Sequence, residues 1–587
     1  MRGSADWAGW TIGRALRRAA DLWPAHAFLI EGEERLSFAG TAHRSGLYAS
    51  ALLAQGVGRG DVVATWLPNC TQWALVWLAC CRIGAAVVPL STRYRAHEAE
   101  YVLRQSRARV LVMADRLWGT DTIALISDFL PEILEPRDAP AGTVAQSCVL
   151  RSKRLPALRH VVLHGRHGIG RARTLEAVLE AGTGTSPRAL RAAEAAVTEE
   201  DTAIIVYTSG TSGRPKGAMQ AHRILRNGAN IARSRHYEPG DVVLGHMPFY
   251  HVAGSVATLI PALQWGQSVA LMASWEPSDA LRLITREPIN VFGGIPTHFI
   301  DLLRALDGRR LAPGTIRSAW IGGANVPAEV ARAASERLGI VSLAAVYGMT
   351  ETGGVTTYTE WGAPIDLVSA NKGKPIGDFE LRVADPLTGA GLRSGEEGEV
   401  HVRGYLVMQG YFDDEPATRA ATTTDGWFRT GDLGRLDPDG NLAITGRLKE
   451  MFIVGGTNAY PAEIEAFLHR HPAIAQAMVC GVPDARLGEV CFAFVEPRPE
   501  AALTAAEVIG FCRGGIADYK VPRFVEILVA LPRTATNKIE RHALQARARR
   551  IAAGSSVSAA QAISAQSPSD GLQRGLHRPA SAERGWP

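Results

Sequence analysis

Cysteine is scarce in this sequence of 587 residues, and its few thiols form no pattern that would bind a metal or build a disulfide framework. No CxxC pair and no cluster of cysteine with histidine occurs among the seven cysteines (Cys70, Cys80, Cys81, Cys148, Cys480, Cys491 and Cys512). The sequence therefore predicts neither a zinc site nor a disulfide-stapled scaffold. A reducing compartment fits this usage.

An excess of charge of one sign is also missing. The chain has 63 Lys and Arg against 58 Asp and Glu, which gives a net charge of +5. So small an excess in a chain of this length gives no reason to expect a polyanion as the main partner. Nucleic acid is therefore not among the expected partners.

Long apolar runs are absent as well. The longest apolar-leaning stretch, WALVWLACCRIGAAVVPL at 73–90, is interrupted by Arg82 and Gly84 and reaches Pro89 near its end. A buried helix that leads into a strand explains this pattern better than a membrane span. The N-terminal residues show no apolar core of signal-peptide length. We expect a cytoplasmic protein.

The length and texture of the chain predict more than one domain. Single cores stop growing at roughly 250 to 300 residues, whereas this chain has 587, of which 46% are apolar. Strand-like runs such as TAIIVY and INVFGG alternate with helical patterns, which favours an α/β fold with largely parallel sheets. We expect a large N-terminal domain of stacked mixed or parallel sheets with flanking helices, and a small mobile α+β domain behind it.

Changes in composition predict the boundaries of these domains. After Gly373 the chain becomes polar and turn-rich, which predicts a small antiparallel β-rich subdomain of the first domain. The predicted domains are 1–446 and 447–549. The Ser-, Ala- and Gln-rich residues 550–587 predict a disordered tail, because they have little apolar surface to bury. A surface insertion is expected at 136–151.

A glycine-rich segment, YTSGTSGRPKGAM at 207–219, follows the apolar run AIIVY. Such a turn can surround phosphate oxygens with backbone amides and hydroxyls, with Lys216 nearby. It is not a P-loop, since Gly217 follows Lys216 where Ser or Thr is needed, and it is not a nucleophile elbow, since position 214 is arginine. Taken alone, the segment is better explained as an ordinary Gly/Ser loop.

Four further motifs accompany this segment: YGMTETGG at 347–354, GWFRTGD at 426–432, GRLKEMFIVGGTNAYPAEIE at 446–465 and LPRTATNKIER at 531–541. In this order and spacing, the five motifs resemble the adenylate-forming superfamily of acyl-CoA synthetases, carrier-protein adenylation domains and luciferases. The resemblance covers the chain from about residue 10 to 548. The segments MPFYHVAG and YFDDEPATRAATTTDGWFRTGD are similar to acyl-CoA synthetases in particular.

The resemblance implies an ATP-dependent acid:CoA ligase that forms an acyl-adenylate, with Mg²⁺ as cofactor and CoA as co-substrate. A carboxylate is a poor electrophile, and transfer of AMP gives it a good leaving group. Because two anions must meet, positioning, cations and magnesium should supply most of the acceleration.

The resemblance also assigns roles to single residues. Thr350 would bond the α-phosphate, Glu351 and Thr208 would hold Mg²⁺, and Lys538, carried by the small domain, would drive adenylation. Nucleotide and CoA would be bound by a larger set: Thr208, Ser209, Gly210, Thr211, Ser212, Gly213 and Lys216 at the phosphates; Tyr347 and Gly348 at adenine; Asp432 and Arg447 at ribose; Gly322, Gly323 and Ala324 along the adenine and acyl channels; Gly455 and Gly456 at pantetheine.

Several points depart from the family pattern or stay open. Asn537 stands where glycine is usual, although asparagine tolerates positive φ, and Thr457 stands where glutamate is common. His251 is interpreted either as a gate between the acyl pocket and the thiol tunnel or as a core histidine. The small domain is expected to rotate about Lys449 between the half-reactions. Gly254, Gly354 and Val355 are further candidate pocket residues.

Alternative functions remain open at this stage. The acid is a fatty, alicyclic or aryl acid, and the acceptor is CoA or the phosphopantetheine of an acyl carrier protein. A non-catalytic acyl- or nucleotide-binding homologue is the rival from another class, while a kinase or ATPase is disfavoured by the missing P-loop. A second copy of the chain, as a homodimer, is a further partner left open.

Overall fold

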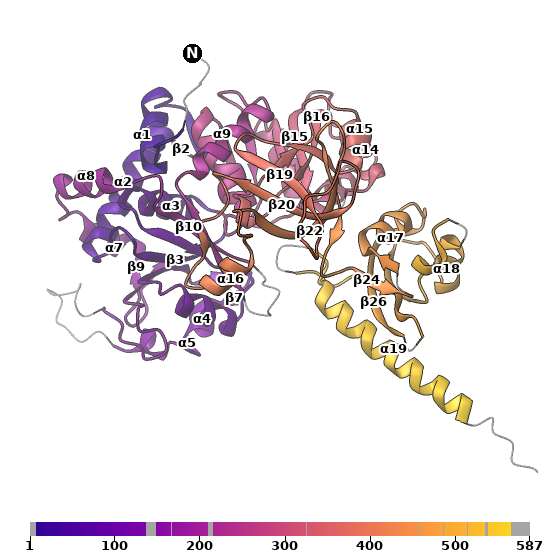
Figure 1. Ribbon diagram of the computed structural model, residues 1–587. Coiled ribbons are helices and arrows are strands. Elements are labelled where there is room, and N and C mark those ends of the chain that lie inside the picture. Colours follow the sequence, from indigo (N-terminus) through magenta and orange to yellow (C-terminus); the bar gives the residue numbers. More distant parts are fainter. Residues whose placement is uncertain are drawn as a thin grey trace, which may run out of the picture. The chain divides into compact units, whose positions relative to one another are not determined.

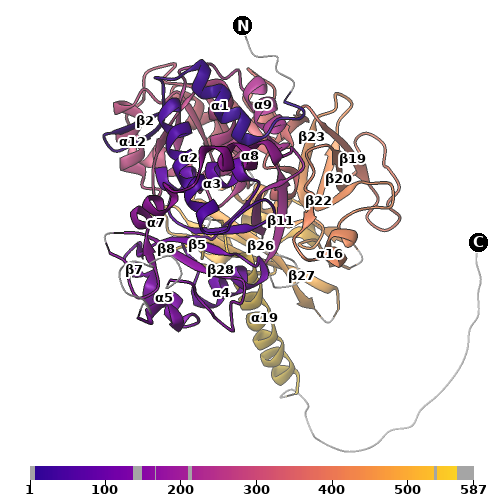
Figure 2. The same ribbon diagram turned by 90° about the vertical axis from the view of Figure 1, so that its left-hand side faces the viewer.

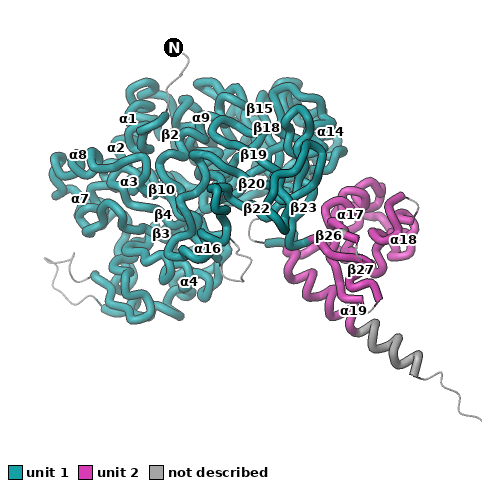
Figure 3. Tube along the Cα trace, in the orientation of Figure 1, with its two compact units in different colours: residues 1–450, 533–539 teal, residues 451–532, 540–587 magenta. Residues whose placement is uncertain are grey.

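The computed structural model describes residues 7–136, 148–165, 167–208, 215–324, 326–455, 457–484, 486–513, 515–534 and 538–564. The chain divides into two compact units, shown in Figure 3. Unit 1 is Met1–Glu450 with Arg533–Ile539, and unit 2 is Met451–Pro532 with Glu540–Pro587. The domain limits predicted at 446/447 and 549/550 stay predictions.

The first sheet of unit 1 is mostly parallel and carries the two ends of the glycine-rich segment. Its central strands pair in the order β10–β4–β3–β5–β8–β9, while β11 and β21 add antiparallel pairs at the β10 edge. The strands are β3 (Val62–Trp66), β4 (Ala86–Pro89), β5 (Val110–Ala114), β8 (His160–His164), β9 (Arg173–Thr174), β10 (Thr202–Thr208), β11 (Lys216–Ala221) and β21 (Gly410–Tyr411). β6 (Arg116–Leu117) and β7 (Thr120–Asp121) form a separate hairpin.

The second sheet of unit 1 has a parallel half and an antiparallel half. Strands β13, β12, β14, β15 and β16 are parallel, and β17, β18, β23, β22, β20 and β19 continue it with antiparallel pairs. The strands are β1 (Ala27–Glu31), β2 (Glu34–Ser37), β12 (Val242–Gly245), β13 (Ser268–Leu271), β14 (Val291–Gly294), β15 (Ile316–Gly322), β16 (Ile340–Tyr347), β17 (Thr357–Tyr358), β18 (Lys372–Pro375), β19 (Phe379–Ala384), β20 (Gly398–Gly404), β22 (Phe428–Leu436) and β23 (Leu442–Arg447). The antiparallel half confirms the β-rich region predicted after Gly373.

Helices cover both sheets, and α1, α2 and α3 pack against one another (Figures 1 and 2). The helices of unit 1 are α1 (Ile12–Leu22), α2 (Phe38–Ala54), α3 (Thr71–Ile83), α4 (Ala96–Gln105), α5 (Thr122–Ser127), η1 (Pro131–Leu134), α7 (Leu175–Gly182), α8 (Pro187–Ala196), α9 (Ile224–Ser234), α10 (Val252–Gly254), the π-helix η2 (Ser255–Leu259), α11 (Ile260–Trp265), α12 (Pro277–Arg286), α13 (Pro296–Ala305), α14 (Ala328–Arg337), η3 (Thr350–Thr352), α15 (Ile365–Ser369) and α16 (Glu415–Ala420).

Helix α3 explains the most apolar stretch of the sequence. Trp73 and Trp77 are fully buried, and the indole Nε1 of Trp77 donates to the carbonyl of Ala203 at 3.1 Å. The helix ends at Gly84, whose φ of 74° is costly for other residues, and β4 follows directly. The predicted buried helix leading into a strand is confirmed. No helix in the described ranges combines the length and the apolar character that a membrane span needs.

Unit 2 is an α+β unit around its own core, which includes Phe452, Ile464 and Val508. Its sheet contains β24 (Phe452–Val454), β25 (Thr457–Ala459), β26 (Ile474–Asp484), β27 (Gly488–Pro497) and β28 (Phe524–Ile527), and its helices are α17 (Pro461–Leu468), α18 (Ala505–Cys512), η4 (Asp518–Lys520) and α19 (Arg541–Ser564). A capping box starts α18, because Thr504 Oγ1 accepts from Glu507 N while Glu507 Oε2 accepts from Thr504 N.

The end of the chain differs from the sequence-based expectation. We predict a disordered tail from residue 550, whereas helix α19 continues to Ser564. The segment IAAGSSVSAAQAIS at 551–564 contains many alanines, and alanine has the highest helix propensity. The prediction of disorder was based on the low content of apolar residues and did not consider helix propensity. Residues 565–587 lie outside the described residues, as does most of the insertion expected at 136–151.

Candidate active site

The ends of the glycine-rich segment are held together in a β-hairpin. Thr208, the last residue of β10, is the register partner of Lys216, the first residue of β11. The hairpin therefore brings a hydroxyl and an ammonium to the base of the same loop. The loop itself, with the predicted phosphate-binding residues Ser209, Gly210, Thr211, Ser212 and Gly213, lies outside the described residues.

Glu351, in η3, faces this hairpin. Its Oε1 atom lies 3.5 Å from the Thr208 hydroxyl and accepts a hydrogen bond from the Tyr411 hydroxyl at 2.9 Å. The Tyr411 ring also lies below Lys216, whose Nζ is 5.1 Å from the ring centroid. Burial raises the pKa of Glu351, and the hydrogen bonds from Tyr411 and Thr208 act against this rise. The structure thus brings together Thr208, Lys216 and Glu351, as the motifs predict.

Tyr411 is a residue that the sequence analysis missed. It is the first residue of the segment YFDDEPATRAATTTDGWFRTGD, from which only the similarity to acyl-CoA synthetases was inferred. Its position follows from strand pairing, because Tyr411 on β21 is the partner of Ala218 on β11. The similarity of this segment to acyl-CoA synthetases could have marked Tyr411 as a candidate site residue. Its contact with Glu351 could not be predicted from the segment.

The backbone of the loop at 349–355 is held by buried amide side chains that the sequence analysis also missed. Gln220 Nε2 donates to the carbonyl of Thr350 at 2.6 Å. Asn227 Nδ2 donates to the carbonyls of Gly353 and Val355 at 2.9 and 3.0 Å. These bonds satisfy carbonyls of an irregular loop. They fix Thr350 and Glu351 against β11 and α9.

Tyr347, Asp432 and Arg447 form a second cluster. The Tyr347 hydroxyl donates to Asp432 Oδ2 at 2.9 Å, and Arg447 Nε lies 3.0 Å from Asp432 Oδ1. Asp432 and Arg447 are register partners on β22 and β23, and Asp432 is buried. Burial raises the pKa of Asp432, while the charge of Arg447 opposes the rise. The three residues predicted for adenine and ribose are therefore neighbours.

The glycines predicted to line the adenine and acyl channels have a different local reason to be glycine. A Cβ atom at Gly322 would lie 2.3 Å from Val346 Cγ1, and one at Gly348 would lie 2.3 Å from the carbonyl oxygen of Gly354. Gly323 has a φ of 73°. Close backbone packing and a left-handed turn require these glycines, whereas Ala324 is exposed. The prediction that these residues also line the adenine and acyl channels stays a prediction.

Lys538 belongs to unit 1 and lies beside Gly323. A Cβ atom added at Gly323 would be 3.7 Å from the Nζ atom of Lys538. Part of the side chain reaches solvent, yet the loss of solvation lowers the pKa of Lys538; Arg447 acts in the same direction, and Asp432 opposes it. Asn537 lies outside the described residues, so its effect on this turn stays untested.

His251 caps the short helix α10, where its Nδ1 accepts from the amide of Ala253 at 3.3 Å. Burial lowers the pKa of His251 to about 4, and the nearby charge of Lys538 contributes. The ring is therefore neutral at pH 7. Val252 and Gly354 are neighbours, since a Cβ atom at Gly354 would lie 3.5 Å from Val252 Cβ. Both interpretations of His251, as a gate or a core residue, remain compatible with this neutral state.

The predicted thiol-side residues are described in unit 2 only in part. Gly455 follows β24 with a φ of 55°, and its amide donates to the carbonyl of Leu487 at 2.8 Å. Gly456 lies outside the described residues. The division between the units falls after Glu450, one residue beyond Lys449. The hinge at Lys449 and the pantetheine contacts stay predictions.

Comparison with known proteins identifies the class to which this fold and site belong. The model of the AMP-binding enzyme family matches residues 16–412, and the model of the AMP-binding enzyme C-terminal domain matches residues 463–538. The chain belongs to the AMP-binding enzyme family. Within this adenylate-forming superfamily it groups with the acyl-CoA synthetases, and the predicted fold class and enzyme class are confirmed.

Individual relatives are similar over almost the whole chain. The 3-[(3aS,4S,7aS)-7a-methyl-1,5-dioxo-octahydro-1H-inden-4-yl]propanoyl:CoA ligase of Mycobacterium tuberculosis is 38% identical over 91% of this chain and 98% of its own length. The solved structure of ATP-bound MatB from Rhodopseudomonas palustris has a TM-score of 0.77 and 27% identity, over 92% of this chain and 100% of that one. The anthranilate CoA ligase AuaEII in complex with anthranoyl-AMP has a TM-score of 0.80 and 25% identity, over 94% and 100% of the two chains.

Proposed function

We propose that this protein is an ATP-dependent carboxylic acid:CoA ligase that converts acid, ATP and CoA to acyl-CoA, AMP and pyrophosphate through an acyl-adenylate. The observation that carries this proposal is the position of Lys538. Its ammonium lies beside Gly323, and its charge acts on the pKa values of both Asp432 and His251. The charge of this one lysine therefore acts on both the candidate ribose site and the candidate acyl site.

The proposed nucleotide site uses the two clusters of unit 1. Asp432 accepts hydrogen bonds from the ribose hydroxyls, a task that suits an acceptor-only carboxylate, and Tyr347 stacks on adenine beside Gly348. Lys216, Thr208 and the loop that follows Thr208 hold the β- and γ-phosphates. Their release lets pyrophosphate leave.

A magnesium ion fits the first cluster. Thr208 Oγ1 and Glu351 Oε1 are 3.5 Å apart, and both are the hard oxygen ligands that Mg²⁺ prefers. Bound there, the ion would supply charge neutralisation for the phosphate oxygens. Tyr411 keeps the Glu351 carboxylate oriented toward Thr208. Among the described residues no larger group of His, Cys, Asp and Glu could hold a metal, which agrees with a site completed by substrate phosphates.

The proposed first step joins two anions. The substrate carboxylate attacks the α-phosphorus, the bond to the pyrophosphate oxygen breaks, and charge accumulates on the phosphoryl oxygens. Thr350 and the ammonium of Lys538 are proposed to stabilise that charge, with both groups fixed before the reaction begins. In the second step a thiolate attacks the acyl carbon and AMP leaves.

The thiol acceptor and the acid are finer parts of the proposal. We favour CoA as acceptor, with Gly455 and Gly456 beside pantetheine after a rotation about Lys449, and an acyl carrier protein is the alternative. Fatty, alicyclic and aryl acids all stay candidates, since the similar ligases act on different acids. A cytoplasmic setting is proposed from the cysteine usage of the sequence, which shows no disulfide framework. The homodimer stays open.

A panel assay tests the proposal. Purified full-length protein is given ATP, Mg²⁺ and single acids that include octanoate, a fused-ring propanoate and anthranilate, and acid-dependent exchange between pyrophosphate and ATP is measured. CoA or a phosphopantetheinylated carrier protein is then added, and the thioester is identified by mass. We expect exchange with at least one acid and formation of acyl-CoA. Thermal stabilisation by ligands without any exchange would favour the non-catalytic homologue instead.

A further inference from the structure

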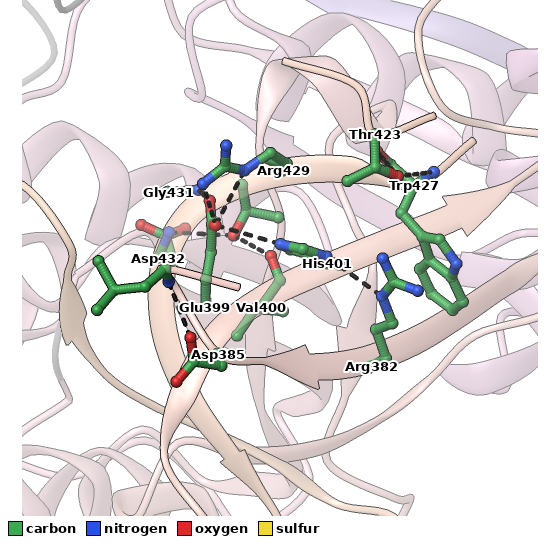
Figure 4. Close-up of polar contacts among 12 residues, drawn as sticks. Arg382, Asp385, Glu399, Val400, His401, Thr423, Trp427, Arg429, Gly431 and Asp432 are labelled. Carbon is green, nitrogen blue, oxygen red and sulfur yellow. Dashed lines mark hydrogen bonds and ion pairs between the residues drawn. The ribbon is translucent and has the colours of Figure 1, made fainter. Parts of the chain in front are cut away.

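Glu399, on β20, is a buried carboxylate beside the irregular part of strand β22 that carries Asp432 (Figure 4). Its Oε1 atom accepts a hydrogen bond from the amide of Gly431 at 3.2 Å. Its Oε2 atom accepts from Nε and Nη2 of Arg429 at 3.0 and 2.8 Å. None of the five motifs contains Glu399.

A histidine completes this network. His401 Nε2 lies 3.2 Å from Glu399 Oε2, and Arg382 Nε donates to His401 Nδ1 at 3.2 Å. Because Nδ1 accepts from Arg382, the neutral ring carries its proton on Nε2 and donates it to Glu399. Arg382 also pairs with Asp425 at 2.7 Å. The carboxylate of Glu399 thus has hydrogen-bond donors at both oxygens, as a buried charge requires.

The same part of β22 has a second attachment to β20. The Thr430 hydroxyl donates to the carbonyl of Val400 at 2.7 Å and accepts from the amide of Asp432 at 3.0 Å. Gly431, between them, has a φ of 71°, a conformation that glycine adopts without strain. The amide of Gly431 is therefore held directly by β20, and the amide of Asp432 is held indirectly, through the hydroxyl of Thr430.

We propose that Glu399 is a positioning residue for the nucleotide site, which fixes the backbone from which Asp432 presents its carboxylate to the ribose hydroxyls. This inference rests on the proposed function, because it takes Asp432 as the ribose ligand. Tyr347 and Arg447 contact the Asp432 carboxylate itself, whereas Glu399 holds the amide of the preceding residue, Gly431. Hydrogen bonds from His401 and Arg429 hold the pKa of Glu399 below its ordinary value despite burial, so that the carboxylate is charged at pH 7.

A merely structural role for Glu399 makes a different prediction. If Glu399 only stabilised the antiparallel half of the sheet, its replacement would lower the melting temperature and would weaken the binding of every nucleotide equally. If it positions Asp432, the loss must depend on the ribose hydroxyls of the ligand. A cycle between a protein variant and a ligand that lacks those hydroxyls separates these two roles.

The experiment measures dissociation constants of ATP and of 2′,3′-dideoxy-ATP by calorimetry, with Mg²⁺ present and without any acid. The proteins are the full-length wild type, Glu399→Gln and the matched control Glu380→Gln. Glu380 lies on the neighbouring strand β19 and pairs with Arg403 at 2.7 Å on the exposed face. The glutamine at 399 keeps the size of the side chain but turns an amide donor toward the donors of Arg429, His401 or Gly431.

We expect Glu399→Gln to raise the dissociation constant of ATP about tenfold or more, which is the scale of a hydrogen bond to a charged group. The dissociation constant of dideoxy-ATP should change less than about threefold. The control variant should change the dissociation constant of neither ligand. If Glu399→Gln weakens the binding of both ligands equally, or leaves the affinity for ATP unchanged, the inference is overturned while the ligase proposal stays intact. A wild type that binds both ligands equally overturns the ribose assignment of Asp432 itself, and one that binds no ATP overturns the proposed function.

A second variant keeps the test decisive if Glu399→Gln does not fold. Arg429→Ala removes the main cationic partner of Glu399, and its side chain is 40% exposed, so the fold should tolerate the change. We expect the same selective loss for ATP, but a smaller one, because Gly431 and His401 still bond Glu399. A loss that is equal for ATP and dideoxy-ATP in this variant also overturns the inference.

Discussion

The hydroxyl of Tyr411 donates a hydrogen bond to Oε1 of Glu351 at 2.9 Å, across two elements that lie far apart in the sequence. The same ring lies under the ammonium of Lys216. Tyr411 thereby connects the proposed metal-binding carboxylate with the proposed phosphate-binding lysine. Since Glu351 is half-buried and its pKa is raised, the loss of this donor should act directly on the carboxylate.

We therefore predict that Tyr411→Phe raises the magnesium concentration needed for half-maximal pyrophosphate exchange. The phenyl ring keeps the contact with Lys216 but removes a hydrogen bond to a charged group, and we expect a loss of about ten- to a hundredfold in kcat/KM for ATP. Titration of exchange with Mg²⁺ measures it. Tyr405→Phe is the control, because Tyr405 lies against Arg226 at 4.2 Å and has no contact assigned to the site. Equal magnesium dependence in wild type and Tyr411→Phe would contradict the prediction.

Contacts of this kind mark the limit of what the sequence predicts. The apolar residues of α3 predict a buried helix because nearly every position is apolar, and the motifs predict the cluster of Thr208, Lys216 and Glu351. The role of Tyr411 depends on the pairing of β21 with β11, and such long-range register is not encoded in a local pattern. Gln220, Asn227 and Glu399 were missed for the same reason, since each contacts a residue that lies 32 or more positions away.

Glycines illustrate a different limit. A motif shows that a small residue stands at Gly322 or Gly348, but not what would collide with a side chain there. In the structure, the collision is with Val346 or with the backbone of Gly354. The helical end of the chain, α19, escaped prediction because local propensity and burial point in opposite directions there.

A second prediction concerns the identity of the adenylating cation. Lys538→Ala should lower acid-dependent pyrophosphate exchange by at least about a hundredfold, as expected when a preorganised charge is lost from a developing anion. Release of acyl-CoA from an added acyl-adenylate should persist. Lys520→Ala is the control, because Lys520 pairs with Glu463 within unit 2. Unchanged exchange in Lys538→Ala together with lost thioester transfer would reverse the assigned roles.

The pH dependence of the first step follows from the same lysine. The pKa of Lys538 is lowered by desolvation and by the charge of Arg447, so the ammonium loses its proton at a lower pH than an ordinary lysine does. We expect exchange to fall on the alkaline side below the usual lysine value of about 10.4. Lys538→Arg should move this limb upward, because the guanidinium stays charged throughout. A pH profile that is identical in both proteins would show that another group is responsible.

The last prediction concerns Asn69, which secures the chain leading to His251. Asn69 is buried; its Nδ2 donates to the carbonyls of Gly245 and Met247 at 3.0 and 2.9 Å, and its Oδ1 accepts from the amide of Phe249 at 2.8 Å. Asn69→Ala leaves these buried backbone groups without that partner, which should cost about 3 kcal/mol of unfolding free energy.

This cost should appear as a lower urea midpoint of the unit 1 transition. The control is Asn441→Ala. Among the described residues, the side chain of Asn441 bonds only to Asp437, in a surface turn. Activity separates the two interpretations of His251. If His251 gates the acyl pocket, Asn69→Ala should change the preference among acids of different length even at temperatures where the protein stays folded. If His251 is a core residue, stability should fall while the order of preferred acids stays the same.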